Sequence, residues 1–150
     1  MTGRMYSAVF EEVDITVVQD LFELVAPSDG IVVLHSVSIS QSNRTVSEML
    51  NLLIHRGSSS GSGGTVPTAH PLDTGSPTFG GTVEVNNTTQ STESNILRAE
   101  NFNILVGYFW QPTPEERIVI PPSGRIVVEL QTAPGSSTKM SGTIVFEEIG

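Results

Sequence analysis

The chain has 150 residues, a formal net charge of −9, and charged residues at only 15% of positions. An average domain carries about 25%. This length is sufficient for one domain that buries roughly 70% of its unfolded surface. The cations are one lysine and six scattered arginines, which excludes a surface built for phosphate backbones or anionic lipids. We therefore expect neither nucleic acid nor a membrane as partner.

Serine and threonine together number 33, whereas cysteine is absent. Surface polarity therefore depends on hydroxyl groups, and disulfides and thiolate metal sites are ruled out. The first five residues lack the charged-then-apolar profile of a signal peptide, and no apolar run approaches about 18 residues. We expect a protein made in the cytoplasm.

Apolar and polar residues alternate with a period of two along much of the chain, which is typical of half-buried strands. The alternation is clearest where one apolar face is predicted to comprise Ile31, Val33, His35, Val37 and Ile39. In chain order, strands are predicted over 5–12, 20–25, 31–41, 82–86, 96–104, 108–111, 117–120, 125–131 and 139–148. Roughly eight to ten short strands separated by turn signals predict an all-β fold, an antiparallel sandwich or barrel.

The segment 45–55 has two interpretations. Thr45 and Glu48 match a capping box at the start of an amphipathic helix. Alternatively, Leu50, Leu52 and Ile54 form one face of a strand. We favour the strand because the surrounding pattern is β.

The longest irregular segment, 57–81, is rich in serine, glycine, proline and threonine. Loops of that length in a compact domain are usually functional or mobile.

No motif predicts catalysis or metal binding. Residues 57–61 match G-x-S-x-G, but a helix cannot follow the serine and no histidine follows Asp73, so a nucleophile elbow is excluded. The histidines lack paired metal-ligand spacing. His35 is expected in the core or an interface, and His55 and His70 at the surface. We predict that the protein is not an enzyme and has no catalytic, cofactor-binding or metal-binding residues, and no cofactor.

Three consecutive aromatic residues, Tyr108, Phe109 and Trp110, lie on a predicted strand. Adjacent strand residues point to opposite faces, so at least one ring must lie outside the core. Either Trp110 closes the end of the core near Pro112 and Pro114, or the three rings contact another subunit.

Short sequence segments in predicted turns and strands, spread over nearly the whole chain, point to a family. They occupy 19–24 (QDLFEL), 26–27 (AP), 37–41 (VSISQ), 55–57 (HRG), 79–82 (FGGT), 112–117 (PTPEER) and 141–148 (SGTIVFEE). In these segments the chain resembles small virion proteins of tailed bacteriophages. Some proteins of similar length and pattern are jelly-roll cement, or decoration, proteins on the outer capsid.

The resemblance implies a single jelly-roll-like sandwich over 1–150 that binds the outer shell of a phage capsid and stabilises it. The implied partners are the major capsid protein and further copies of the chain, as a trimer or a dimer. The implied location is the capsid exterior, with Tyr108, Phe109 and Trp110 as candidate subunit or capsid interface. A tail- or fibre-associated virion protein, or a carbohydrate-binding sandwich, is the alternative; a glycan module would display its rings on an outward groove.

Overall fold

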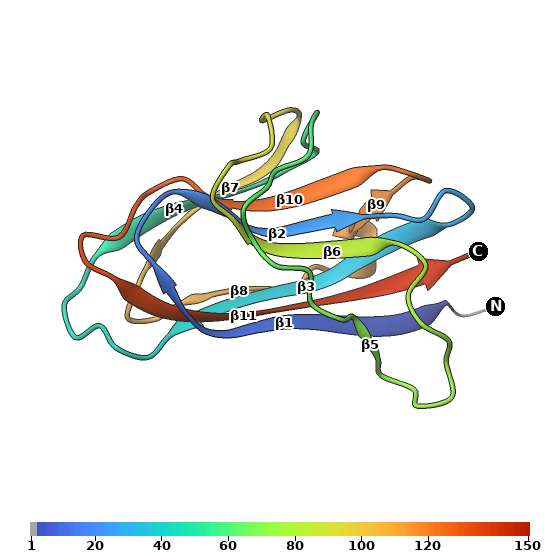
Figure 1. Ribbon diagram of the computed structural model, residues 1–150, viewed down its shortest axis with the longest axis horizontal. Helices are drawn as coiled ribbons and strands as arrows, with labels where there is room; N and C mark the ends of the chain where they lie inside the picture. The colour runs from blue at the N-terminus through green and yellow to red at the C-terminus, as the bar shows by residue number, and fades with distance from the viewer. Residues whose placement is uncertain (1–2) are drawn as a thin grey trace.

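In the computed structural model, which describes residues 3–150, two antiparallel β-sheets face each other in a sandwich (Figure 1). The strands are β1 (Arg4–Ile15), β2 (Gln19–Val25), β3 (Ile31–Gln41), β4 (Met49–His55), β5 (His70–Pro71), β6 (Thr82–Asn87), β7 (Ile96–Asn103), β8 (Tyr108–Trp110), β9 (Ile118–Ile120), β10 (Arg125–Leu130) and β11 (Thr138–Ile149). A 3-10 turn, η1, spans Pro114–Glu116. Within residues 3–150, no helix has the length and apolar character needed to cross a bilayer.

The two sheets differ in size. The six-stranded sheet has the order β5-β1-β11-β3-β8, and β9 pairs with another part of β3. The five-stranded sheet has the order β6-β2-β10-β4-β7. The predicted antiparallel β-sandwich is confirmed.

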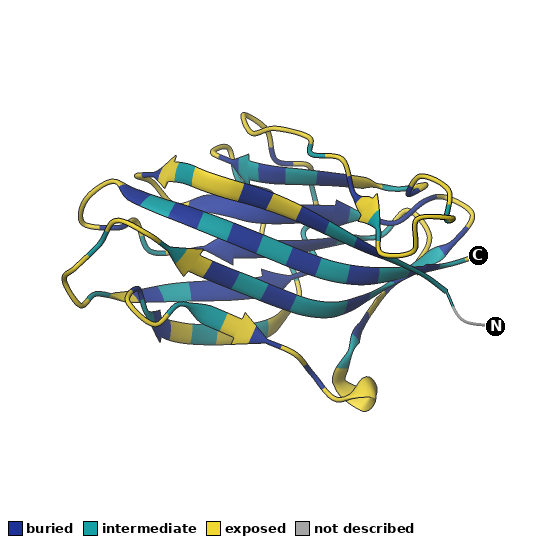
Figure 2. Ribbon diagram, turned by 90° about the horizontal axis from the view of Figure 1, so that it is seen from below, coloured by how far each residue is buried: buried dark blue, intermediate teal, exposed yellow. Residues whose placement is uncertain are grey.

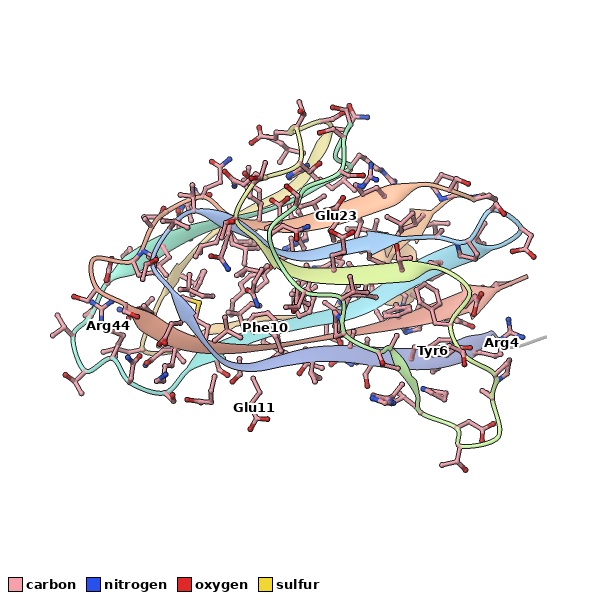
Figure 3. All side chains as sticks on the ribbon, viewed as in Figure 1. Arg4, Tyr6, Phe10, Glu11, Glu23 and Arg44 are labelled. Atoms are coloured by element: carbon pink, nitrogen blue, oxygen red, sulfur yellow. The ribbon has the colours of Figure 1, made fainter. Side chains whose placement is uncertain are left out.

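The core lies between the sheets and receives side chains from both. Alternate residues along β1, β11 and β3 are buried, which gives these strands the banded pattern of Figure 2. Tyr6 and Phe10 point from β1 into the space between the sheets (Figure 3). The Phe10 ring packs at 5.2 Å from that of Phe22 on the facing sheet, and Tyr6 packs at 5.9 Å from Phe146. Full burial of such a ring contributes about 1.5–3 kcal/mol.

The predicted single apolar face of 31–41 is wrong in its first half. A bulge leaves His35 without a partner residue on β11, and a bulge shifts the alternation by one position. Val32 and Leu34 therefore fill the core, whereas Val33 points outward. Val37 and Ile39 face inward as predicted.

The segment 45–55 contains strand β4 and no helix. Leu50, Leu52 and Ile54 are buried on its inner face, so the favoured interpretation is confirmed. The other predicted strands lie within a few residues of their predicted positions.

Part of the long loop lies against the outer surface of the five-stranded sheet. The segments 57–66 and 88–95, green and yellow in Figure 1, run side by side there. The Ser62 and Thr89 backbones bond to each other, and Ser58 N–H donates to the Thr92 carbonyl at 2.9 Å. We call these two segments the cover.

Candidate functional site

The outer face of the central strands β2, β10 and β4 carries buried polar side chains. Glu129 lies opposite Asp20, and Val127 lies opposite both Glu23 and His55. Directly opposite residues in a sheet point to the same face. All five are buried, although they point away from the sandwich core.

A bulge in β2 brings the two acidic residues of that strand together. Phe22 pairs with β10 and so does Asp20, which leaves Leu21 without an opposite residue. Leu21 and Phe22 both enter the core. Asp20 and Glu23 therefore share the outer face, although an uninterrupted strand would place them on opposite faces.

The cover shields this face from water and donates hydrogen bonds to it. Gly61 N–H donates to Glu23 Oε2 at 3.0 Å, and Ser91 N–H donates to Asp20 Oδ2 at 2.7 Å. The Gln90 side-chain amide donates to Glu129 Oε1. We call Asp20, Glu23, His55 and Glu129 the polar layer.

Glu23 is satisfied within this layer. Its Oε1 lies 2.6 Å from Arg125 Nε in an ion pair, and its Oε2 also accepts a bond from Asn87 Nδ2 at 2.9 Å. Arg125 donates in turn to Ser60 Oγ in the cover at 2.9 Å. A buried carboxylate needs such a cation and several donors to offset its lost hydration.

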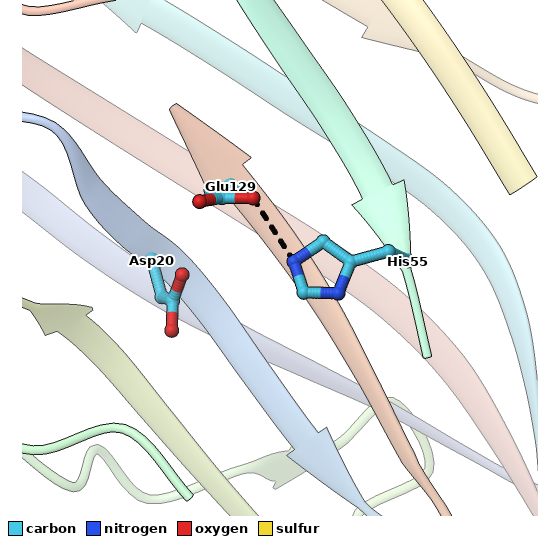
Figure 4. A group of neighbouring side chains, drawn as sticks. All are labelled: Asp20, His55 and Glu129. Atoms are coloured by element: carbon cyan, nitrogen blue, oxygen red, sulfur yellow. Dashed lines mark ion pairs between the residues drawn. The ribbon is translucent and has the colours of Figure 1, made fainter. Parts of the chain in front are cut away.

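His55, Glu129 and Asp20 converge at one point beside this pair (Figure 4). His55 Nε2 lies 3.0 Å from Glu129 Oε2, and one ligand atom from each residue lies within 4.8 Å of the others. His55 Nδ1 accepts the Gly57 N–H at 3.1 Å. The ring proton therefore belongs on Nε2, facing Glu129.

Burial raises the pKa of the Asp20 carboxyl from 3.8 to about 7. The Ser91 N–H opposes the shift, while the charges of Glu129 and Glu23 add to it. An ionised Asp20 would place a third carboxylate in a site where Arg125 already pairs with Glu23.

The polar layer is enclosed, which limits its chemistry. His55 and Asp20 are 0% exposed, so a substrate cannot reach them while the cover is closed. One imidazole and two carboxylates can hold a transition metal ion. The arrangement is suited to binding an ion or fastening the cover.

The predicted histidine positions are partly wrong. His55 is completely buried rather than at the surface, whereas His70 is exposed. His35 is half-buried and pairs with Glu147, at 3.0 Å between Nε2 and Oε2. The elbow-like Ser59 exchanges hydrogen bonds with Thr92, and therefore serves to fasten the cover.

The three consecutive aromatic residues divide between the two faces of β8, with Tyr108 and Trp110 on the inner face and Phe109 on the outer face. Trp110 is buried at 7% exposure, with the Arg98 guanidinium 5.2 Å from its ring centre. Tyr108 is half-buried beside Phe102, at 5.9 Å between ring centres, and burial raises the pKa of its hydroxyl while Arg98 opposes the shift. Phe109 is 66% exposed. A ring on each side of the strand was predicted from sequence and is observed.

Phe109 ends a row of outward-facing residues on the six-stranded sheet. Across β1, β11, β3 and β8, Val9 lies opposite Thr143, Thr143 opposite Ser38, and Ser38 opposite Phe109. Val9 and Phe109 are exposed, and the two residues between them are at least partly so. We call these four residues the outer row. It contains no charged side chain.

Sequence reasoning missed Asp20 and Glu129. A detectable signal was present, because Asp20 precedes the apolar pair Leu21 and Phe22, and Glu129 is flanked by apolar residues in the strand segment RIVVEL. Comparison of the chain with protein-family models, curated proteins and solved structures gives no match.

Proposed function

We propose that the protein is a structural virion protein of a tailed phage, a cement protein that binds the outer capsid shell and stabilises it. The observation that carries the proposal is the outer row, an uncharged strip across four strands that ends in exposed Phe109. Interface centres are depleted in charge and enriched in aromatic side chains. The choice of a phage capsid as the partner comes from the resemblance to phage virion proteins that we infer from the sequence.

The outer row suits a close contact with another protein. Thr143 and Ser38 are small, so a flat partner surface can approach the sheet there. Phe109 adds a large apolar side chain at the edge, the kind of residue that anchors interfaces. The proposed partner is the major capsid protein in its assembled shell, on the capsid exterior. Further copies of the chain would form a closed trimer, or secondarily a dimer.

A carbohydrate-binding role receives less support from the aromatic side chains. Sugar rings stack on exposed aromatic faces, and tryptophan and tyrosine also offer a hydrogen-bonding group. Trp110 is buried and Tyr108 half-buried, which leaves Phe109 with its purely apolar ring. This distribution favours a protein surface as partner. Association with a tail or fibre could use the same row.

The test is co-sedimentation of the purified protein with phage shells that lack it, and separately with isolated tails. Phe109→Ser should weaken shell binding at least about tenfold, as expected for an interface anchor. Val46→Ser is the matched control, since Val46 is 64% exposed but lies in the β3–β4 connection, and it should bind like wild type.

Absence of shell binding by the wild-type chain would end the cement proposal, and binding to tails alone would replace it with the tail-associated role. Equal binding by the two variants would remove the outer row from the contact. Light scattering gives the number of 16.0 kDa chains per particle, and a pure monomer at tens of micromolar would contradict the oligomer.

A further inference from the structure

We propose that Asp20, His55 and Glu129 form a binding site for a single divalent transition metal ion, with Zn²⁺ as the first expectation, beneath the cover. This site is independent of the proposed capsid role. It also departs from the sequence-based expectation of no metal.

The negative charge of the buried carboxyl groups favours a bound cation. Asp20, Glu23 and Glu129 are three buried carboxyl groups on one sheet face. Arg125 forms an ion pair with Glu23, and His55 has its Nδ1 occupied as an acceptor. Asp20 and Glu129 are thus left with neutral donors and no buried cation among the described residues. Buried carboxylates are costly unless a positive charge compensates them.

Asp20 and Glu129 are each held by the carboxylate oxygen that faces away from the centre of the site. Asp20 Oδ1 is buried and lacks a hydrogen-bond partner among residues 3–150. His55 Nε2 is also buried, and its one polar neighbour named above is the Glu129 Oε2 atom at 3.0 Å, which does not lie in hydrogen-bond geometry. The opposite atoms, Asp20 Oδ2 and Glu129 Oε1, accept bonds from Ser91 N–H and the Gln90 amide. Metal-binding carboxylates are typically oriented in this way by outer donors.

The spacing and the chemical type of the three ligand atoms suit Zn²⁺. Zinc binds nitrogen and oxygen at about 2.0–2.2 Å, so its ligand atoms lie roughly 3–4 Å apart. His55 Nε2 and Glu129 Oε2 are already 3.0 Å apart, and all three ligand atoms lie within 4.8 Å. The largest separation, 4.8 Å at most, therefore exceeds the spacing of zinc ligands by only about 1 Å. One imidazole with two carboxylates favours Zn²⁺ over Ca²⁺, which takes oxygen ligands.

Metal binding requires one local change. Coordination by His55 Nε2 moves the ring proton to Nδ1. In the metal-free structure, Nδ1 accepts the Gly57 N–H. The peptide between residues 56 and 57 must then turn its N–H away. Gly57 has φ of +60°, and glycine adopts positive and negative φ about equally well, so this rotation is accessible. The metal would therefore be coupled to the conformation at the start of the cover.

The test measures Zn²⁺ binding by the untagged full-length protein after dialysis against a chelator. Because the site is closed, Zn²⁺ is added both to native protein and during refolding, and bound metal is counted after gel filtration. We expect one Zn²⁺ per chain, a higher unfolding temperature that a chelator reverses, and ¹⁵N chemical shifts that place the His55 proton on Nδ1. No saturable binding by either route, or a His55 ring that keeps its proton on Nε2, would overturn the proposal.

The variants Asp20→Asn and Glu129→Gln preserve shape and remove a ligand charge, and each should lower Zn²⁺ affinity by about tenfold or more. The matched control is Glu147→Gln, because Glu147 forms a comparable 3.0 Å pair with His35 outside the proposed site. It should bind Zn²⁺ like wild type. Equal loss in all three variants would assign the binding to the surface and reject the site. If Asp20→Asn fails to fold, the His55 ring shifts of the wild type decide the question.

Discussion

The two outer faces of this sandwich are both formed by antiparallel strands, but one face is open to solvent and the other is covered. The outer face of the six-stranded sheet is open and carries the uncharged outer row. The outer face of the five-stranded sheet is closed by the cover and buries the polar layer. An acidic residue in a strand therefore does not by itself identify the solvent side of a sheet.

The difference follows from the hydrogen-bond acceptors that each face offers to a loop. A loop that crosses a sheet must find partners for its own N–H groups. The carboxylates of Asp20 and Glu23 provide those partners for Ser91 and Gly61. The outer row offers short hydroxyl groups and apolar side chains, which hold no loop in this way. The closed face is therefore specialised for internal fastening, and the open face is available for contact with another molecule.

Loss of the Glu23 carboxylate should produce the largest difference between the faces. Glu23→Ala would leave the Arg125 charge and the Gly61 N–H without their acceptor and would remove one of the two acceptors of the Asn87 amide. Breaking a buried pair in this way costs about 3–5 kcal/mol of unfolding free energy. The matched change on the other sheet is Glu11→Ala, since Glu11 is exposed and points away from the sandwich (Figure 3). It should change stability by no more than about 0.5 kcal/mol.

Urea unfolding of both variants measures the difference. A similar small effect for both would mean that the Glu23 network adds nothing beyond its surface counterpart.

The inner side of the open sheet should give the next largest effect. Ile144 is buried on β11, and Thr143 beside it belongs to the outer row. Ile144→Ala leaves a cavity in the core and should lower the unfolding free energy by about 2–4 kcal/mol. Thr143→Ala should cost less than about 1 kcal/mol. Thermal and urea unfolding check the pair, and equal costs would refute the alternation of β11.

The side to which a residue points can be predicted from the sequence in unbroken strands such as β11, but not in strands that contain a bulge. On β6, β10 and β11 the apolar residues at every second position of the sequence are the ones that enter the core, because neighbouring residues along an unbroken strand face opposite sides. On β2 and β3 a single extra residue, Leu21 or His35, reverses the faces. A bulge depends on pairing with a strand far along the chain, so local periodicity cannot locate it.

The polar layer was missed for a related reason. Asp20, His55 and Glu129 come from strands separated by tens of residues and meet only through sheet register. His55 also follows an apolar run and precedes the Ser/Gly segment, where exposure is the natural expectation. It is buried because the cover folds back over its own strand.

Attachment of the cover can be tested with a smaller change than loss of Glu23. A Cβ at residue 61 would lie 2.8 Å from the Thr89 carbonyl oxygen and 3.0 Å from Asp20 Oδ2. Gly61→Ala should therefore push the cover outward and cost about 1–3 kcal/mol. Gly75→Ala is the control, because its nearest neighbour, Asp73 Oδ1, lies 3.6 Å away.

The measurement is amide hydrogen exchange at Gly61 and Ser91 together with urea unfolding. The Gly61→Ala variant should exchange faster at Ser91, while Gly75→Ala leaves protection unchanged. Unchanged exchange at Ser91 in the first variant would show that the cover tolerates the added methyl group.

The smallest stability effect should come from the residue with the most prominent proposed role in binding. Phe109 is 66% exposed at the end of the outer row, so the folded chain gains little from its ring. Phe109→Ser should change the unfolding free energy of the monomer by no more than about 0.5 kcal/mol. If copies of the chain associate through this face, the wild type alone should become more stable as its concentration rises, because association draws on the folded state. Unfolding at several concentrations separates the two contributions. A loss above about 1 kcal/mol at every concentration would mean that the ring packs within its own chain, and the outer row would then lose its proposed anchor.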